Sequence, residues 1–575
     1  MRKLYTMLTA ALVAAGLGAT AAPAHPTLAT AKANSQKTER AQRLTRSAAQ
    51  AKGLDVTPLK AKKSAARHIA APEDVYFMTD QPEGDLKVYT KRGLSYVYNW
   101  LFGLMLQSAD GSITEIVTAD DGSVYMNNPI AGLPSQAWVK GKVEGDKYIF
   151  ELPAQVAHEE YDYGDGEVEV YDDYCVKLEY QEDEDGGWYY PCEDQTFTFT
   201  LQADGSLLPE SSELMLGDCM WLDDEDGNFS YSWQGTGDFV ESLVPLTDKL
   251  LEVPATAQFE NWYLLAGGGV REMPVAIDGN NVYLKNVYTE EDTAESAIVG
   301  TISEDGKTVT FKSGQYLGEW WEYMTVLYFD GVKVVQEYDP DYDEYYDTYE
   351  FLPELTFAYD AEKKTLKSEN AWVISTSPTS ISYYEDVVEP IIKWQNPDFT
   401  VTALPDPVID YFYDAMPEYG YCAEVYFDFP RYDADNNVLP ADKLFWNLIL
   451  DNEVFEFFPD EYTDLTEPMT DVPYGFSSDY EFSAAGSQHG CYVYPEGFES
   501  LGVRTGYKDG DKVIYSNIAW VEGYAAIKGI EAGNAVSSKY YDLNGIEVSR
   551  PANGIFVRRS VMENGQVVTS KVIKR

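Results

Sequence analysis

Cysteine and histidine are scarce in this chain of 575 residues, which has five of the former and four of the latter. So few cysteines exclude a disulfide-built scaffold, and none stands in the C-x-x-C pair typical of zinc or redox sites. The five are Cys175, Cys192, Cys219, Cys422 and Cys491. The first two flank a hairpin expected around Gly186-Gly187, but the sequence leaves the pairing open, and the odd number leaves one thiol over.

Motifs of known catalytic centres are also missing. After residue 73 only His158 and His489 remain, and His158-Glu159 lacks the second histidine of a zinc protease helix. There is no G-x-S-x-G elbow and no phosphate-binding loop of the G-x-x-x-x-G-K type. A pair of carboxylates suffices for glycoside hydrolysis, but 96 acidic residues make any single pair uninformative. The sequence therefore favours a non-catalytic role without specifying one.

Long apolar runs are confined to the first residues. Arg2 and Lys3 precede an apolar stretch that ends near Leu17, and Ala22-Pro23-Ala24 follows as a signal peptidase site. The stretch is shorter than the roughly 20 residues that span a bilayer. We therefore expect a signal peptide over residues 1–24, a secreted or cell-surface protein, and no transmembrane segment.

Basic residues are few, and the formal net charge is −54. Residues 1–72 contain 12 of the 42 basic residues and only two of the 96 acidic ones, so the rest of the chain is more negative still. The basic segment 25–72 lacks aromatic residues and is predicted to be a flexible leader. A surface this acidic repels phosphates, which excludes nucleic acid as a partner.

Tyrosine is abundant, with 45 residues beside 24 phenylalanines and 12 tryptophans. Residues 123–126, 147–152 and 196–201 mix β-branched and aromatic residues, and the last segment alternates with a period of two. Glycine-containing turn pairs separate such segments. They are Asp121-Gly122, Gly145-Asp146, Asp204-Gly205, Asp278-Gly279, Asp305-Gly306 and Asp509-Gly510. The pattern predicts an all-β protein with tandem sandwich-like or barrel-like domains and a small C-terminal β module.

An internal repeat predicts the organisation of the first two domains. The segment VTADDGSVYM at 117–126 resembles VAIDGNNVYL at 275–284. Similar residues recur at a nearly constant offset for about 80 positions, which predicts two homologous β domains at 73–250 and 251–400. Further matches pair 137–141 with 297–300, Lys147 with Lys307, Gln155 with Gln315, Phe197 with Phe357, and Leu207 with Leu366.

Two further units follow the repeat. Residues 401–525 lack its pattern, and the apolar segments 444–450 and 454–458 predict buried strands of a third sandwich. The C-terminal unit, 530–575, contains YYDLNG at 540–545, PANGIFV at 551–557 and a basic last segment at 571–575. This end resembles the C-terminal sorting domain of the type IX secretion system of Bacteroidetes, which implies export by that system. The repeat and the third unit resemble secreted Bacteroidetes multidomain β proteins of unknown function.

Calcium is the only metal for which the sequence offers ligands. Two acidic loops place side-chain oxygens at alternate positions, as hard cations prefer. The first contains Asp339, Asp341 and Asp343, and the second contains Asp433, Asp435 and Asn437. A solvated acidic turn is the alternative for each loop, because neither leads into a helix and Val438 stands where an EF-hand has glycine.

The leading hypothesis is a non-catalytic binding or adhesion protein whose partner is a glycan or a surface protein. The candidate ligand-binding residues are Trp188, Tyr189, Trp320 and Trp321, because aromatic rings stack on sugar rings. Packing of these rings in a core is the alternative, although two consecutive tryptophans in a strand would point to opposite faces. A secreted carbohydrate hydrolase with accessory domains and a structural surface protein are the other hypotheses. The oligomeric state stays open.

Overall fold

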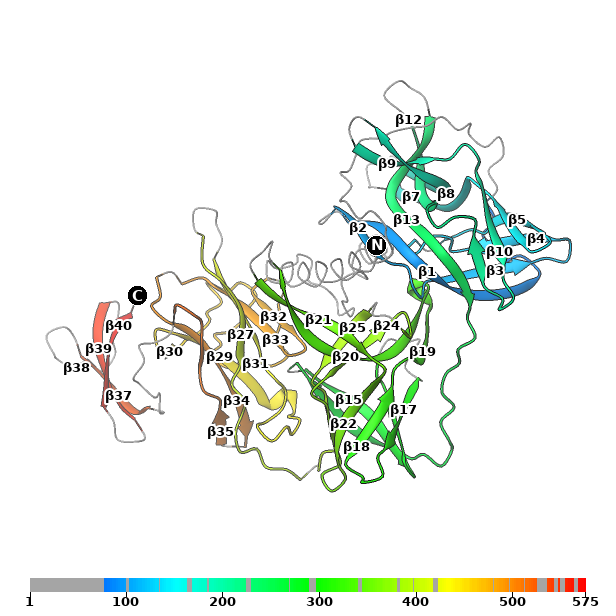
Figure 1. Ribbon diagram of the computed structural model, residues 1–575. Coiled ribbons are helices and arrows are strands. Elements are labelled where there is room, and N and C mark those ends of the chain that lie inside the picture. Colours follow the sequence, from blue (N-terminus) through cyan, green and yellow to red (C-terminus); the bar gives the residue numbers. More distant parts are fainter. Residues whose placement is uncertain are drawn as a thin grey trace.

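The computed structural model is built almost entirely of β-strands, which confirms the all-β prediction (Figure 1). In the part of the chain that it describes, no helix reaches seven residues, and none could cross a membrane. The described residues are 77–99, 103–133, 135–162, 168–183, 186–223, 229–267, 269–288, 296–339, 344–379, 383–396, 398–416, 422–478, 480–495, 497–510, 512–524, 535–541, 547–548, 554–562 and 567–574. The expected signal peptide and basic leader lie outside these residues.

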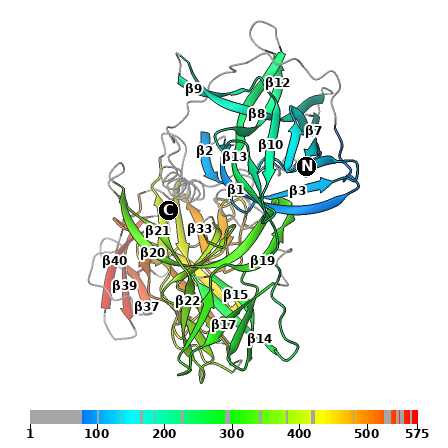
Figure 2. The same ribbon diagram turned by 45° about the vertical axis from the view of Figure 1, so that its right-hand side comes forward.

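The first unit is a sheet that closes on itself because its first strand pairs with its last. The ring runs in the order β1 (Asp85–Asn99), β3 (Ile113–Thr118), β4 (Ser123–Asn127), β5 (Val139–Glu144), β6 (Lys147–Glu151), β10 (Thr196–Leu201), β11 (Leu207–Pro209) and β13 (Phe229–Pro245). Further strands extend it to one side, namely β2 (Gly103–Ser108), β7 (Ala154–Asp162), β8 (Val168–Asp183), β9 (Gly186–Pro191) and β12 (Met215–Asp223). Figure 2 shows this unit above the second one.

The second unit is a closed barrel with the same succession of strands. Its ring contains β14 (Phe259–Ala266), β15 (Gly269–Asp278), β16 (Asn281–Lys285), β17 (Ala297–Ile302), β18 (Thr308–Lys312), β22 (Glu354–Asp360), β23 (Thr365–Lys367) and β26 (Ile391–Lys393). Its side sheet contains β19 (Gln315–Trp320), β20 (Thr325–Asp339), β21 (Glu344–Leu352), β24 (Ala371–Ser375) and β25 (Tyr383–Val388). A short 3-10 helix, η2 (Trp321–Tyr323), connects β19 to β20. The side strands β7, β8 and β9 of the first unit pair as β19, β20 and β21 do here.

Alternation of side chains places the cores inside the barrels. In β10, Phe197 and Phe199 are fully buried and their rings contact each other, and the ring of Phe199 also packs edge-to-face with that of Phe150. All the glycines of the predicted turn pairs have positive φ, the region that glycine occupies without a Cβ penalty. In several of these turns the aspartate accepts a backbone N–H two residues on, as Asp121 does from Ser123.

The third unit consists of two packed sheets around one apolar cluster. One sheet contains β27 (Val408–Tyr413), β28 (Ala423–Asp428), β33 (Gln488–Val493) and β32 (Phe482–Ala485). The other contains β30 (Glu453–Val454), β29 (Leu444–Leu450), β34 (Leu501–Asp509), β35 (Lys512–Tyr515), β31 (Val472–Pro473) and β36 (Ala519–Trp520), and the helix η4 (Ala441–Lys443) precedes β29.

The strand predicted at 444–450 is β29, and all its residues are buried. The strand predicted at 454–458 is wrong beyond Val454, because β30 ends there. Phe457 is buried but reaches the core as an isolated bridge to Met469 rather than from a ladder. Its apolar neighbours gave this loop the composition of a strand.

The C-terminal unit is a four-stranded sheet in the order β38 (Glu547–Val548), β37 (Ala535–Tyr541), β39 (Gly554–Met562) and β40 (Val567–Lys574). Residues 542–546 and 549–553, which hold part of the motif that resembles a sorting domain, lie outside the described residues. Export by the type IX system therefore stays a prediction.

Candidate functional site

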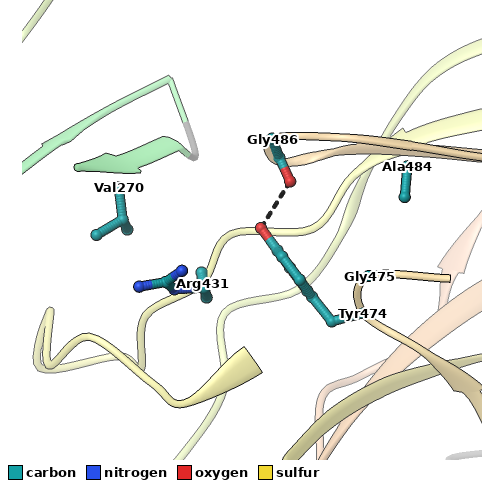
Figure 3. A pocket seen from close by; sticks show the side chains of 6 residues that line it. All are labelled: Val270, Arg431, Tyr474, Gly475, Ala484 and Gly486. Atoms are coloured by element: carbon teal, nitrogen blue, oxygen red, sulfur yellow. Dashed lines mark hydrogen bonds between the residues drawn. The ribbon is translucent and has the colours of Figure 1, made fainter. Parts of the chain in front are cut away.

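A small, partly open cavity lies where the second barrel meets the third unit (Figure 3). Its volume is about 190 Å³, below the roughly 300–1,000 Å³ of sites for drug-sized ligands. It is lined by Val270, Arg431, Tyr474, Gly475, Ala484 and Gly486. A cavity of this size suits one small group, such as a single sugar ring or a carboxylate, rather than a polymer chain.

Arg431 gives the cavity its polar character. It follows β28, and Figure 3 shows its guanidinium between Val270 of β15 and the ring of Tyr474. The Nε atom of Arg431 is buried and has no hydrogen-bond partner among the described residues. A buried guanidinium N–H without an acceptor costs free energy.

Tyr474 forms the opposite wall of the cavity. Its hydroxyl donates a hydrogen bond to the carbonyl oxygen of Gly486 at 2.8 Å, and its ring packs against Phe429 and His489. Burial raises the pKa of Tyr474 to about 12, with Asp428 adding to the rise and Arg431 opposing it. The hydroxyl therefore stays protonated and positions the ring rather than acting as a base.

A pair of carboxyl groups lies behind this wall. Asp410 of β27 and Asp428 of β28 share a hydrogen bond, and burial together with the charge of Asp428 raises the pKa of Asp410 to about 6. Ser487 donates to Asp428 Oδ1 at 3.1 Å and also contacts the carbonyl oxygen of Gly267 in the second barrel at 3.3 Å. Such a pair shares one proton below neutral pH, since two adjacent carboxylates repel each other.

His489 is a buried structural residue next to the same wall. Its Nδ1 lies 2.8 Å from the carbonyl oxygen of Ser487, and its Nε2 lies 2.6 Å from that of Tyr474. Burial lowers the pKa of this imidazole. Both ring nitrogens face backbone oxygens, so the side chain links two loops and has no nitrogen left for a substrate.

The acidic loop at 433–437 has its oxygens engaged within the protein. Asp433 is fully buried, and its Oδ1 accepts the backbone N–H groups of Asp435 at 2.9 Å and Asn437 at 2.7 Å. Its Oδ2 accepts Asn437 Nδ2 at 3.0 Å, and Lys393 Nζ lies 3.2 Å from the Asp435 carbonyl oxygen. These contacts hold an acidic turn against the second barrel. Ala434 and Asp435 are exposed, as in the solvated-turn alternative, but Asp433 is buried. A calcium ion would have to displace them.

The other candidate calcium ligands are described only in part. Asp339 ends β20, whereas Asp341 and Asp343 lie outside the described residues. Among the described residues, no three histidine, cysteine or acidic side chains are arranged to hold a metal. Calcium therefore stays a prediction for both loops.

The four candidate aromatic residues differ in exposure. Trp188 is buried, with its ring 4.8 Å from that of Trp233, and Tyr189 is half-buried in the same aromatic cluster. Trp320 is buried at the end of β19, whereas Trp321 begins η2 and is 44% exposed. Core packing thus accounts for Trp188 and Trp320. The strand β19 ends before Trp321. Of the four candidates, only Trp321 is therefore an exposed ring for stacking.

None of the five cysteines forms a disulfide bond. The hairpin expected around Gly186-Gly187 is formed by β8 and β9, with Asp183 opposite Gly186. Cys175 and Cys192, which flank it, are both buried and form no disulfide. The same holds for Cys219 and Cys491, and Cys422 is a half-buried thiol. Burial raises the pKa of the Cys175 and Cys491 thiols, which makes these thiols poor nucleophiles.

Asp330 of β20 is another buried acid. Its Oδ1 accepts the backbone N–H of Gly314 at 2.8 Å, and its Oδ2 is buried without a hydrogen-bond partner. Burial raises the pKa of Asp330 to about 7, whereas an aspartate of an unfolded chain has a pKa of about 3.9. The folded protein therefore binds a proton that the unfolded chain releases between about pH 4 and pH 7.

We expect Asp330→Asn to remove a pH dependence of stability. The stabilisation by protonated Asp330 is complete below about pH 4 and is lost as the pH rises to 7. At pH 8 the free energy of unfolding of the variant should therefore exceed that of the parent by about 4 kcal/mol. The advantage should shrink as the pH falls to 5. Denaturant titrations of both chains at pH 5 and pH 8 measure it, with the exposed Glu304→Gln as the matched control. An equal difference at both pH values would contradict the assignment.

No family model and no curated protein matches the chain. The site therefore has to be interpreted from its own geometry. Sequence patterns did not point to Arg431, Tyr474, Asp410 or Asp428, because each is an ordinary residue of a turn or strand until the fold brings β15, β28 and the turn between β32 and β33 together.

Proposed function

We propose that this protein is a secreted or cell-surface binding protein, and that the cavity beside Arg431 accepts an acidic group of a glycan. The observation that carries the proposal is the guanidinium of Arg431 in the wall of the cavity, with an Nε atom that is buried and has no acceptor among the described residues. A guanidinium presents N–H groups in a planar fork that matches a carboxylate, and such charge-assisted pairs are stronger than neutral hydrogen bonds.

The surroundings of the cavity support an acidic sugar over a free anion. Tyr474 offers an aromatic face and Val270 an apolar one, while Gly475 and Gly486 let backbone approach the ligand closely. The net charge of −54 repels free anions at long range, so an acidic ligand needs such additional contacts. Trp321, at 44% exposure, is a separate stacking residue for a sugar.

A glycan-array screen of the purified protein tests the proposal, run with and without millimolar calcium. We expect binding to acidic glycans, and we expect Arg431→Gln to weaken it at least tenfold, since a charge-assisted bidentate pair contributes about 1.5–3 kcal/mol. Lys333→Gln, which removes an exposed cation of β20, should leave binding unchanged.

The outcomes separate the sites. Binding that weakens only on Trp321→Ala would move recognition to η2, and loss on chelation would add calcium to it. Silence across the array under both conditions would leave a protein partner or a structural role.

Carbohydrate hydrolysis is the second candidate function, because Asp410 and Asp428 supply two convergent carboxyl groups, and burial raises the pKa of both. The pair is joined by a hydrogen bond, whereas retaining glycosidases hold their carboxyl groups about 5–5.5 Å apart and inverting enzymes hold them farther apart. The geometry thus favours a shared structural proton. Release of reducing sugar from an array-positive glycan, abolished by Asp410→Asn, would favour the hydrolase.

A further inference from the structure

The first barrel is closed by a buried pair of opposite charges. Lys91 lies in β1 and Asp238 in β13, the two strands that complete the ring. Their side chains are 1% and 0% exposed, and Lys91 Nζ contacts Asp238 Oδ2. The pair therefore sits at the seam between the first and last strands of the barrel, out of reach of water.

Hydrogen bonding around this pair is incomplete if it is an ion pair. Lys91 Nζ donates to the carbonyl oxygen of Pro129 at 2.8 Å and to Asp238, which uses two of the three N–H bonds of an ammonium. Asp238 Oδ2 also accepts the backbone N–H of Ala131 at 2.7 Å, but Oδ1 is buried and has no partner among the described residues. A fully buried carboxylate with one unpartnered oxygen is costly.

We propose that Lys91 and Asp238 become joined by an intramolecular amide between Nζ and Cγ. The ammonium first gives a proton to the carboxylate across their contact, which yields a neutral amine and a neutral acid. The amine then attacks Cγ, the N–Cγ bond forms, and the Cγ–O bond breaks. In the tetrahedral intermediate the transferred proton passes from Oδ2 to Oδ1. Oδ1 then leaves as water with this proton and a second proton from nitrogen, so the reaction needs no other reactant.

The amide accounts for every polar atom at the seam. Its single N–H keeps the carbonyl oxygen of Pro129 as acceptor, and its remaining oxygen keeps the N–H of Ala131. Amide formation removes one carboxylate oxygen, and Asp238 Oδ1 is the oxygen that has no hydrogen-bond partner among the described residues. The same contacts that are insufficient for an ion pair are thus sufficient for an amide.

The surroundings of the pair are cut off from water. The fully buried thiol of Cys175 lies within electrostatic range of Lys91, Asp238 and Asp218, and burial raises the pKa of this thiol. Burial also raises the pKa of Asp218, on the neighbouring strand β12. The pair therefore lies in a dry cluster, where no water competes with the amine for Cγ.

The second barrel serves as an internal comparison. Lys91 lies opposite Leu243 in the closing ladder of the first barrel, and Leu265 lies opposite Ile391 in that of the second. The buried Leu265 thus occupies the equivalent place at that seam and has no amine. The chain should therefore lose one water, not two.

Intact mass spectrometry of the purified, denatured full chain tests the proposal. We expect nearly all molecules to be lighter by one water than the sequence between their measured termini. Trypsin should release a branched peptide in which residues 88–92, still uncleaved after Lys91, are joined to residues 178–249. Asp238→Ala should have the full mass and release the two peptides separately.

Two outcomes would overturn the amide. One is the full sequence mass in a wild-type chain that circular dichroism shows to be folded, because the pair would then be an ion pair only. The other is a missing water that maps to any peptide without Lys91 and Asp238. Lys91→Arg keeps the positive charge but should not form the amide. We therefore expect this variant to have the full sequence mass, which would show that the missing water comes from the amide and not from burial of a cation.

Discussion

Replacement of Lys91 by methionine is expected to lower the free energy of unfolding of the first barrel by about 3–5 kcal/mol, because it leaves Asp238 buried without its partner. Asp238 is fully buried and its Oδ1 already has no hydrogen-bond partner among the described residues. An amide between the two side chains would add the loss of a covalent closure to this cost. Urea denaturation followed by near-ultraviolet circular dichroism measures the change.

A double variant identifies the origin of the cost. Lys91→Met combined with Asp238→Leu removes both charges, so it should be more stable than Lys91→Met alone. Lys87→Met is the matched control, since Lys87 lies on the same strand with a side chain that is 56% exposed and surface ion pairs contribute little. A single variant no less stable than this control would mean that the seam tolerates an unpaired carboxylate.

Much of the fold was predictable because local rules act strongly on this chain. The aspartate–glycine turns fix where strands end, and the alternation in 196–201 fixes which side chains enter the core. Closure of the barrels was not predictable, because it depends on pairing between the first and last strands of each ring, far apart in sequence. The loop at 455–458 shows the limit of composition, since burial there comes without a ladder.

The candidate site was much less predictable than the fold. Trp188 and Trp320 belong to polar, aromatic segments, yet long-range packing buries both. Asp433 has the spacing of a cation ligand, but backbone N–H groups of its own turn occupy its Oδ1 atom and the side-chain amide of Asn437 occupies its Oδ2 atom. Arg431 became a candidate only because, in the folded chain, its Nε atom has no hydrogen-bond acceptor among the described residues. No sequence pattern encodes that property.

The two barrels are joined by backbone contacts that depend on Gly111. Its carbonyl oxygen accepts the N–H of Val326 at 3.0 Å, and the N–H of Ile113 donates to the carbonyl oxygen of Met324 at 2.6 Å. Ile113 and Val326 are fully buried in an apolar cluster shared by both barrels. Gly111 has a φ of +83°, and a Cβ there would collide with the carbonyl oxygen of Thr376 in the second barrel.

We therefore expect Gly111→Ala to weaken the junction by about 2–4 kcal/mol, from left-handed backbone strain of about 1–3 kcal/mol and loss of hydrogen bonds of about 1 kcal/mol each. The parent barrels should unfold together in scanning calorimetry, and the variant should show two separate transitions. Gly122→Ala is the matched control, because Gly122 has a φ of +86° but open space around its Cβ position. It should carry the strain without uncoupling the barrels. Two transitions in both variants would trace the effect to backbone strain alone, whereas a single transition in Gly111→Ala would mean that the apolar cluster couples the barrels without these backbone contacts.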